Sequence, residues 1–321
     1  MKLRTIATAV ATVMIAGAAS ANDWRGWNIH PEGYPNSVAL DQFVEEVNAE
    51  TDLELQVFHG GVLGSQPDAI EQVRNQALEF GNFNLGPMGP IIPITNVVSL
   101  PFIFSSVDHM HRVMDGEVGE RFAAEMAKDG LIPLAWYDSG SRSFYNSKRP
   151  ITAPADVEGM KLRVMNNDLF VDMVAQLGGN ATPMAFGEVY QSLKTGVIDG
   201  AENNYPSYES TGHYEVAGFY SITDHLIIPE CLCVNAAAWE GLDDATKAAV
   251  RTAARNSAAT QRELWSAREA ESRAKVEAAG SKVNEVVDKA AFQDRMGAVY
   301  DDFIAKNPDL AAMIAAVKAV E

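Results

Sequence analysis

The hydrophobic and polar positions of the chain follow two different periods. Short runs such as "LELQVF" (53–58) and "LIPLAWYD" (131–138) are typical of strands, whereas "EVGERFAAEMAKDG" (117–130) has the apolar spacing of a helix. Clusters of glycine and proline separate these segments. The pattern predicts strands and helices that alternate along the chain, which is an α/β architecture with mostly parallel sheets and crossover helices.

The first unit of this alternation lies near the N-terminus. "GWNIHPEGYPNSVALDQFVEEV" predicts a short strand, a turn rich in Pro and Gly, and an amphipathic helix whose inward candidates are Val38, Phe43, Val44 and Val47. The alternation resumes from "SFYNSK" (143–148) to "VIDGAENN" (197–204). Two α/β units in series predict two lobes, and 321 residues are enough for two cores.

A different pattern marks the C-terminal third. Residues 242–279 contain neither Gly nor Pro, Asp243 or Asp244 can cap the start of a helix, and Gly280 can end it. One helix of this length would extend about 55 Å and would have to lie across both lobes. The alternative is a pair of shorter helices with a break between them.

The first 21 residues have the features of a secretory signal peptide. Lys2 and Arg4 precede a short apolar run, and Ala19-Ser20-Ala21 is a small-residue cleavage site, so we expect the mature chain to begin at Asn22. No later segment offers eighteen uninterrupted apolar residues. The formal net charge is −18, which disfavours nucleic acid and anionic lipid as partners. The sequence predicts an exported, soluble protein.

Little in the sequence indicates a metal, a cofactor or an active site. Cys231 and Cys233 are interpreted as buried thiols in a strand, not as a disulfide or a metal site. His109 and His111 lie two apart in a predicted helix, so their side chains diverge, and we interpret them as part of a solvated face. We therefore expect no metal, no cofactor and no catalytic residues.

One basic position deserves a functional hypothesis even before any comparison. In "DVEGMKLRVMNN" (156–167), Arg163 falls at the end of a short apolar run, where a strand passes into a loop. An arginine at such a strand end is a candidate contact for an anion, because its planar fork of donors matches a carboxylate. The alternative is a surface arginine that pairs with a neighbouring carboxylate.

Several stretches together resemble the solute-binding proteins of tripartite ATP-independent periplasmic (TRAP) transporters, the DctP-type family. They are "LPFIF" (100–104), "GSRSFYNSKRPI" (140–151), "ADVEGMKLRV" (155–164), "TPMAFGEVYQSLKTGVIDGAEN" (182–203), and "TDHL" followed by "VNAAAWEGL". The resemblance implies two α/β lobes that close on one small acid, with the long helix running between them. We place lobe I at 22–139 plus 229–267 and lobe II at 140–228 plus 268–321.

The same resemblance implies roles for particular residues. It assigns the ligand carboxylate to Arg163, a second basic position to Arg142, and a bracing asparagine to Asn203. Phe186 is similar to an aromatic wall of the family's site, and Asn84 to a polar position that touches ligand from the first lobe.

Two departures from the family pattern bear on the ligand. This chain has "ENNYP" where relatives often have a shorter "ENP", which leaves the role of Asn204 open. "WNIHPEGYPN" places His30, Glu32 and Tyr34 where many relatives have small polar residues. We expect His30 and Glu32 to hydrogen-bond ligand hydroxyls on the first-lobe side.

The sequence therefore predicts a monomeric periplasmic receptor, not an enzyme, that delivers a small organic acid to the membrane permease of a TRAP transporter. One carboxylate and several hydroxyls would satisfy the basic and polar residues together, which favours a hexuronate such as glucuronate or galacturonate. A C4-dicarboxylate, held at both ends by Arg163 and Arg142, is the alternative within the family. An exported sugar-acid hydrolase or lyase built around His30 and Glu32 is the alternative of another class.

Overall fold

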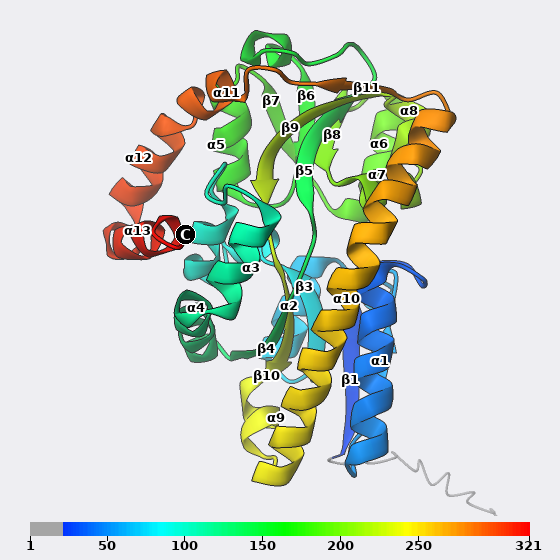
Figure 1. Cartoon of the computed structure of the whole chain (residues 1–321), viewed down its shortest axis with the longest axis vertical. Helices are drawn as coiled ribbons and strands as arrows, with labels where there is room; N and C mark the ends of the chain where they lie inside the picture. The colour runs from blue at the N-terminus through cyan, green and yellow to red at the C-terminus, as the bar shows by residue number, and fades with distance from the viewer. Residues whose placement is uncertain (1–21) are drawn as a thin grey trace, which may run out of the picture.

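The structure is a computed structural model that describes residues 22–321. It contains two β-sheets, each with its own helices, stacked along the long axis of the molecule (Figure 1). The signal peptide predicted at residues 1–21 lies outside the described residues. The prediction of a two-lobe α/β fold is confirmed, since each sheet forms the centre of one lobe.

The first lobe is built on five strands. They are β1 (Asp23–Asn28), β2 (Glu54–Phe58), β3 (Phe80–Asn84), β4 (Leu131–Tyr137) and β10 (Glu230–Asn235). Their order in the sheet is β2-β1-β3-β10-β4. β1 pairs in parallel with β2 and β3, whereas β10 is antiparallel to both β3 and β4.

The second lobe is built on six strands. They are β5 (Ser141–Asn146), β6 (Lys161–Val164), β7 (Asn180–Pro183), β8 (Gly200–Asn203), β9 (Phe219–Ile227) and β11 (Lys282–Glu285). Their order is β11-β9-β5-β8-β6-β7, and β5 is antiparallel to both of its neighbours.

The expectation of mostly parallel sheets is therefore only partly right. The chain crosses between lobes from β4 to β5 and from β9 to β10. A strand that enters its sheet from the junction between the lobes runs away from that junction, opposite to the strands that end there. This is why β5 and β10 are antiparallel to their neighbours, and it brings the ends of strands from both sheets to one junction.

Helices cover the sheets. Those between strands of the first sheet are α1 (Pro35–Glu50), α2 (Gln66–Arg74), α3 (Val107–Asp115) and α4 (Glu117–Lys128). Those of the second lobe are α5 (Asp168–Gln176), α6 (Val189–Thr195), α7 (Tyr205–Ser210) and α8 (His213–Val216), and α9 (Ala236–Glu240) follows β10. Short 3-10 helices occupy Gly86–Met88, Pro93–Ser99, Pro154–Val157, Phe186–Glu188 and Pro308–Leu310.

The core of the first lobe explains most of the hydrophobic pattern in α1. Phe43 and Val47 are buried and Val44 is partly buried, as expected, but Val38 is 40% exposed. Trp24 and Trp27 are buried core residues, and Trp27 stacks on Phe83. Within residues 22–321, no helix is long and apolar enough to cross a membrane.

The long helix α10 (Asp244–Ala278) is continuous, so the single-helix prediction is right and the alternative of a break is wrong. The side chain of Asp243 caps its first turn by accepting a hydrogen bond from the Thr246 backbone N–H. The helix contacts α1 and β4 in the first lobe and α7 in the second (Figure 1). It therefore braces both lobes along one side of the molecule.

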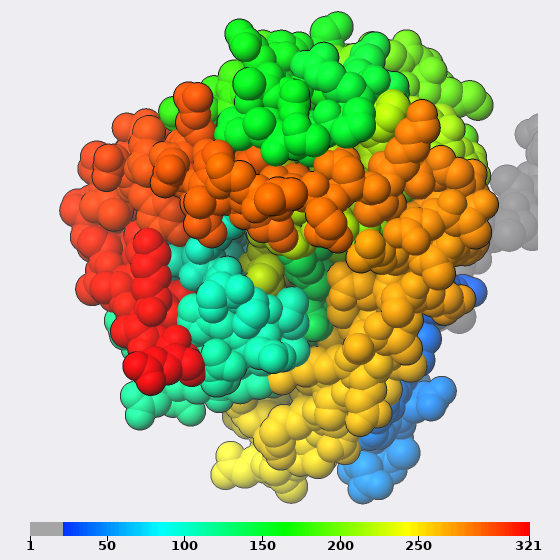
Figure 2. All heavy atoms as spheres, turned by 45° about the horizontal axis from the view of Figure 1, so that its top comes forward, coloured from blue at the N-terminus to red at the C-terminus, as the bar shows by residue number. Residues whose placement is uncertain are grey.

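The C-terminal segment continues from α10 through α11 (Lys289–Arg295), α12 (Gly297–Lys306) and α13 (Ala311–Lys318). Figure 2 shows it as a surface band that runs from gold through orange to red across one face. α12 contacts α5 of the second lobe, and α13 contacts α4 of the first. The residue boundaries that we gave the two lobes stay a prediction.

One expectation about the core is wrong. Cys231 and Cys233, expected to be separate thiols, form a disulfide within β10. The two Cα atoms are 5.4 Å apart, which lies in the range that a disulfide can bridge. The pairing of β10 with β4 shifts register between Leu232 and Cys233, so the strand is not regular at this point. That local irregularity is not visible in the spacing of the two cysteines.

Candidate functional site

A cavity of about 280 Å³ lies where the strand ends of the two lobes meet. In the first lobe β3 ends at Asn84 and β10 begins at Glu230. In the second, β8 ends at Asn203, and β5 and β6 place Arg142 and Arg163 near the same junction. Polar side chains from strands far apart in the sequence thus converge on one volume, close to the lower end of the size of small-molecule sites, roughly 300 Å³.

Seven of the eight residues predicted to bind ligand line this cavity: Arg163, Arg142, Asn203, Asn84, Phe186, His30 and Asn204. Glu32 does not line it. The fold therefore brings together almost the whole predicted set, and their contacts with a ligand stay predictions.

Arg163 is a buried cation that donates to a backbone carbonyl. It is 4% exposed, and its Nε and Nη2 atoms donate to the backbone oxygen of Met184 at 3.1 and 2.9 Å. Within the described residues it makes no ion pair, and Phe186 lies 5.9 Å from its guanidinium carbon. Burial lowers the pKa of Arg163 to about 10, which still leaves it charged at neutral pH. The remaining donors of the guanidinium can serve an anion in the cavity.

Arg142 lies in a different environment. Its Nε and Nη2 atoms donate to the two carboxylate oxygens of Glu202 at 2.6 and 2.8 Å, and its Nη1 donates to Asn203 Oδ1 at 2.7 Å. Burial alone would lower the pKa of Arg142, but the charge and hydrogen bonds of Glu202 raise it above its usual value. The charge of Arg142 is therefore balanced within the protein.

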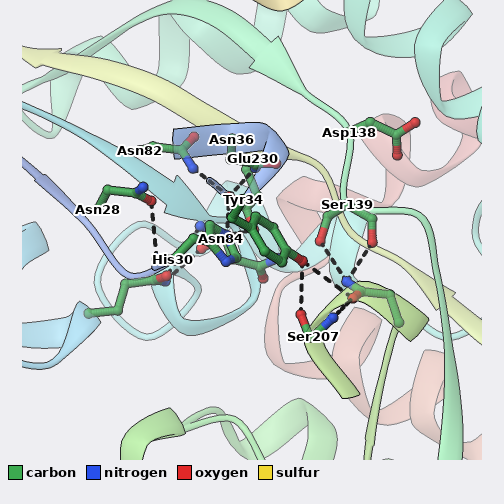
Figure 3. A network of polar contacts seen from close by, with 12 residues as sticks. Asn28, His30, Tyr34, Asn36, Asn82, Asn84, Asp138, Ser139, Ser207 and Glu230 are labelled. Atoms are coloured by element: carbon green, nitrogen blue, oxygen red, sulfur yellow. Dashed lines mark hydrogen bonds and ion pairs between the residues drawn. The ribbon is translucent and has the colours of Figure 1, made fainter. Parts of the chain in front are cut away.

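The first-lobe wall is a network centred on Glu230 (Figure 3). His30 Nε2 lies 3.0 and 3.1 Å from the two carboxylate oxygens of Glu230, and Asn36 and Asn82 each donate to Oε2, at 2.8 and 2.5 Å. Burial would raise the pKa of Glu230, but the charge of His30 and these hydrogen bonds lower it overall. Glu230 also lines the cavity, so it is a site residue that sequence analysis missed.

Glu32 lies outside the cavity, and the reason is a turn. The Tyr34 backbone N–H donates to the Pro31 carbonyl, which makes Glu32 and Gly33 the central residues of a tight turn. Gly33 has a φ of 75°, a conformation that glycine adopts without strain, and Glu32 is exposed to solvent. The acidic group that faces the cavity beside His30 is Glu230, some 200 residues away in the chain.

Tyr34, the third residue that departs from the family pattern here, lies behind the cavity wall. Its ring stacks on His30 with the ring centres 4.2 Å apart. Its hydroxyl contacts Ser207 Oγ at 3.0 Å and donates to Asn204 Oδ1 at 3.5 Å (Figure 3). Tyr34 therefore supports His30 and ties the start of α1 to α7 of the second lobe.

Two amide side chains at the cavity, Asn204 and Asn84, have different hydrogen-bond partners. The side chain of Asn204 caps α7 by accepting from the Ser207 N–H, and its Nδ2 donates to the Ser139 carbonyl. This answers the open question of its role in structural terms. Asn84 Oδ1 accepts from the Gly86 N–H at 3.0 Å, while its Nδ2 has no protein partner in the described part of the chain. Asn84 thus keeps a donor for a ligand.

The expectation for the histidine pair in α3 is wrong, because His109 is not solvated. It is 5% exposed, and its Nε2 lies 3.1 Å from the Val317 carbonyl oxygen in α13. His111 Nε2 faces Asp138 Oδ2 at 3.3 Å. Among residues 22–321, no group of three or more His, Cys, Asp and Glu side chains is arranged to hold a metal ion.

Two lobes joined by crossing strands, with an anion-receptive cavity between them, define a solute-binding protein. Residues 28–307 match the family of bacterial extracellular solute-binding proteins, family 7, known as DctP. The chain belongs to this family: it is a periplasmic solute-binding protein of a TRAP transporter, a transport receptor and not an enzyme.

Relatives and solved structures agree with this assignment. A solute-binding protein of Chromohalobacter salexigens is 58% identical over 305 residues, which is 94% of this chain and 91% of the relative. A TRAP solute-binding protein from Roseobacter denitrificans, solved with β-D-glucuronate, is 63% identical, with a TM-score of 0.92 over 93% of this chain and 100% of that one. One from Sulfitobacter, solved with β-D-galacturonate, is 55% identical, with a TM-score of 0.91 over 92% and 99%.

Proposed function

We propose that this receptor captures a hexuronate, glucuronate or galacturonate, through its carboxylate and hands it to the TRAP permease. The observation that carries the proposal is Arg163, a buried cation in the cavity that has no carboxylate partner among residues 22–321. An unpaired buried charge is costly, and a ligand carboxylate would remove that cost. A bidentate pair with the free donors of Arg163 would fix the orientation of the ligand.

Similarity supports a uronate within the range of organic acids. The solved relatives at 55% to 63% identity were crystallised with glucuronate or galacturonate. Relatives at 42% identity, from Xanthobacter autotrophicus and Bradyrhizobium, carry galacturonate.

The alternative of a C4-dicarboxylate requires a second free cation. Arg142 is the residue available for that role, but Glu202 already binds its Nε and Nη2 atoms, and Asn203 binds its Nη1. The rest of the cavity offers groups suited to hydroxyls, such as the free Nδ2 of Asn84 and the ring of His30. A ligand with one carboxylate and several hydroxyls therefore uses the site better than a ligand with two carboxylates.

Calorimetric titration of the purified protein tests the ligand class. D-glucuronate and D-galacturonate are expected to bind more tightly than succinate and L-malate, by at least about tenfold. A parallel thermal-shift assay should show the same ranking, because a ligand at about 100 times its dissociation constant adds about 2.7 kcal/mol of stability. Tighter binding of succinate than of both uronates would refute the proposal.

Delivery to the permease requires that the loaded and empty receptors differ in shape. We expect the lobes to close about the two crossings between the sheets, at 138–140 and 228–229, which lie between β4 and β5 and between β9 and β10. Small-angle scattering should then give a smaller radius of gyration after addition of glucuronate. An unchanged profile at saturation would contradict closure. Vesicles that contain the transporter's membrane subunits should take up labelled glucuronate only when this protein is added.

A further inference from the structure

Glu230 is a buried acid in the cavity wall, on the lobe opposite Arg163. It begins β10 of the first sheet and is 2% exposed, whereas Arg163 lies near the end of β6 of the second sheet. Both residues line the same cavity. A ligand that spans the cavity with its carboxylate on Arg163 therefore presents its other end to the wall that contains Glu230.

We propose that Glu230 selects the oxidation state of that far end: it accepts a hydrogen bond from a hydroxyl of the hexuronate and excludes aldarates, which carry a second carboxylate there. The inference rests on the proposed function, because it takes the first carboxylate to be held by Arg163. A hexuronate and the matching aldarate have the same carbon skeleton and differ in the oxidation state of C1. In the hexuronate C1 is a hemiacetal that closes the sugar ring, whereas in the aldarate C1 is a carboxylate and the chain is open. A residue that discriminates between them by charge must respond to the carboxylate at C1, and the Glu230 variants separate this effect from the difference in ligand shape.

The hydrogen bonds of Glu230 leave it able to accept one more. Its Oε2 accepts hydrogen bonds from the side chains of Asn36 and Asn82. The Nε2 atom of His30 lies within hydrogen-bond distance of both Oε2 and Oε1. A carboxylate has about four acceptor positions, so Oε1 keeps capacity for a further donor. A sugar hydroxyl can donate to it, whereas a ligand carboxylate has no proton to donate.

The surroundings of Glu230 also leave little positive charge for a second anion. His30 is its one basic contact in the described part of the chain, and its other two partners are neutral amides. The network lowers the pKa of Glu230, so the group is an anion at neutral pH despite its burial. A second carboxylate beside it would meet a like charge in a desolvated place, which disfavours binding.

The network holds the Glu230 carboxylate in one position. Asn36, which donates to Glu230, also accepts a hydrogen bond from Gln261 of α10, and Tyr34 stacks on the His30 ring from behind. Figure 3 shows Asn36 of α1, Asn82 of β3 and His30 of the turn after β1 gathered around Glu230. A group fixed in this way discriminates by position as well as by charge.

The test compares D-glucuronate with D-glucarate by calorimetry on the wild type, Glu230→Gln, Glu230→Asp and Glu32→Gln. The wild type is expected to bind glucarate at least about 100-fold more weakly than glucuronate. Glu230→Gln removes the charge and should bind glucuronate more weakly. The ratio of the glucarate to the glucuronate dissociation constant should fall at least about tenfold in this variant. Glu230→Asp keeps the charge and should keep the rejection of glucarate. Glu32→Gln removes an exposed carboxylate of the neighbouring turn and should change neither affinity.

The possible outcomes separate this inference from the proposed function. If the wild type binds glucuronate and glucarate within about threefold, or Glu230→Gln keeps the full ratio, the role of Glu230 is wrong and the uronate assignment stands. If the wild type binds glucarate but neither uronate, the role of Glu230 and the proposed function are both wrong. The wild-type comparison needs no variant, so glucarate binding within about threefold of glucuronate would overturn the role of Glu230 even if Glu230→Gln fails to fold.

Discussion

Two arginines of the second lobe lie near the same junction between the lobes but have opposite electrostatic environments. Arg142 and Arg163 are both buried, and both line the cavity. Glu202 raises the pKa of Arg142, whereas burial, with no adjoining carboxylate, lowers that of Arg163 to about 10. A buried arginine with its own carboxylate serves the fold, and one without a carboxylate is available to a ligand. Residue type and exposure alone do not distinguish the two.

The largest expected effect is on stability, at Arg142. Arg142→Ala would leave the buried Glu202 without its charged partner, and we expect the free energy of unfolding to fall by about 3 to 5 kcal/mol. His225 Nε2 lies 3.8 Å from Glu202, but burial lowers the pKa of His225, so this ring does not replace the lost charge. Urea unfolding measures this loss. The double variant Arg142→Met with Glu202→Leu removes both charges and should recover most of it. A loss below about 1 kcal/mol in the single variant would mean that the pair does not stabilise the fold.

Arg163 should show its effect in binding. Arg163→Lys keeps the charge but loses the planar fork, and we expect glucuronate affinity to fall by about 2 to 5 kcal/mol, roughly 30-fold to several thousand-fold. Calorimetry measures this change. Arg149→Lys, at an exposed arginine of the same lobe, is the matched control and should bind normally. A loss of less than about threefold at Arg163 would remove it from the role of anchor.

The sequence predicted the elements whose cause is local. Residues 242–279 lack Gly and Pro and begin next to Asp243, and the helix runs over Asp244–Ala278 with that side chain as its cap. The strand ends that carry Arg163 and Asn203 were also found, because strand-to-loop transitions and family motifs mark them. Propensity and capping act over a few residues, so a single sequence reveals them.

The parts that sequence analysis missed depend on contacts between distant segments. Glu230 joins His30 across 200 positions, and Arg142 joins Glu202 across 60, so neither pairing has a local signal. Glu32 was chosen because it stands where many relatives have a small polar residue, but the turn at Gly33 exposes it. A usable signal for Glu230 did exist: an acidic residue directly after Pro229, at a predicted crossing between the lobes, is a candidate for the cavity.

A half-buried acid in α10 extends the comparison of the two arginines. Glu269 of α10 makes no ion pair within the described residues, and burial, together with Asp138 and Asp224, raises its pKa to about 7. A raised folded-state pKa means that the stabilising contribution is present below the usual value of 4.5 and is lost as the pH rises through about 7.

Replacement of Glu269 tests this predicted dependence of stability on pH. Glu269→Gln should raise the free energy of unfolding at pH 8 by about 1 to 2 kcal/mol, with a much smaller effect at about pH 5. Thermal unfolding at the two pH values measures the difference. Glu263→Gln, at an exposed position of the same helix, should show no such dependence. An equal effect of Glu269→Gln at both pH values would contradict the raised pKa.

The smallest expected effect is at Tyr34, where the question is whether a residue behind the cavity wall acts on the fold or on the ligand. Its hydroxyl contacts Ser207 and Asn204 of the second lobe, while its ring supports His30 of the first. Tyr34→Phe keeps the stacking and removes one buried hydrogen-bonding group, so stability should fall by about 1 kcal/mol. Glucuronate affinity should stay within about fivefold of the wild type, since the ring still positions His30.

Tyr190→Phe, at a hydroxyl bonded to Glu215 on the surface, is the control and should leave both stability and glucuronate affinity unchanged. A loss of more than about 100-fold in affinity for Tyr34→Phe would place its hydroxyl in contact with the ligand, and the boundary between supporting and binding residues in the first lobe would then have to include it.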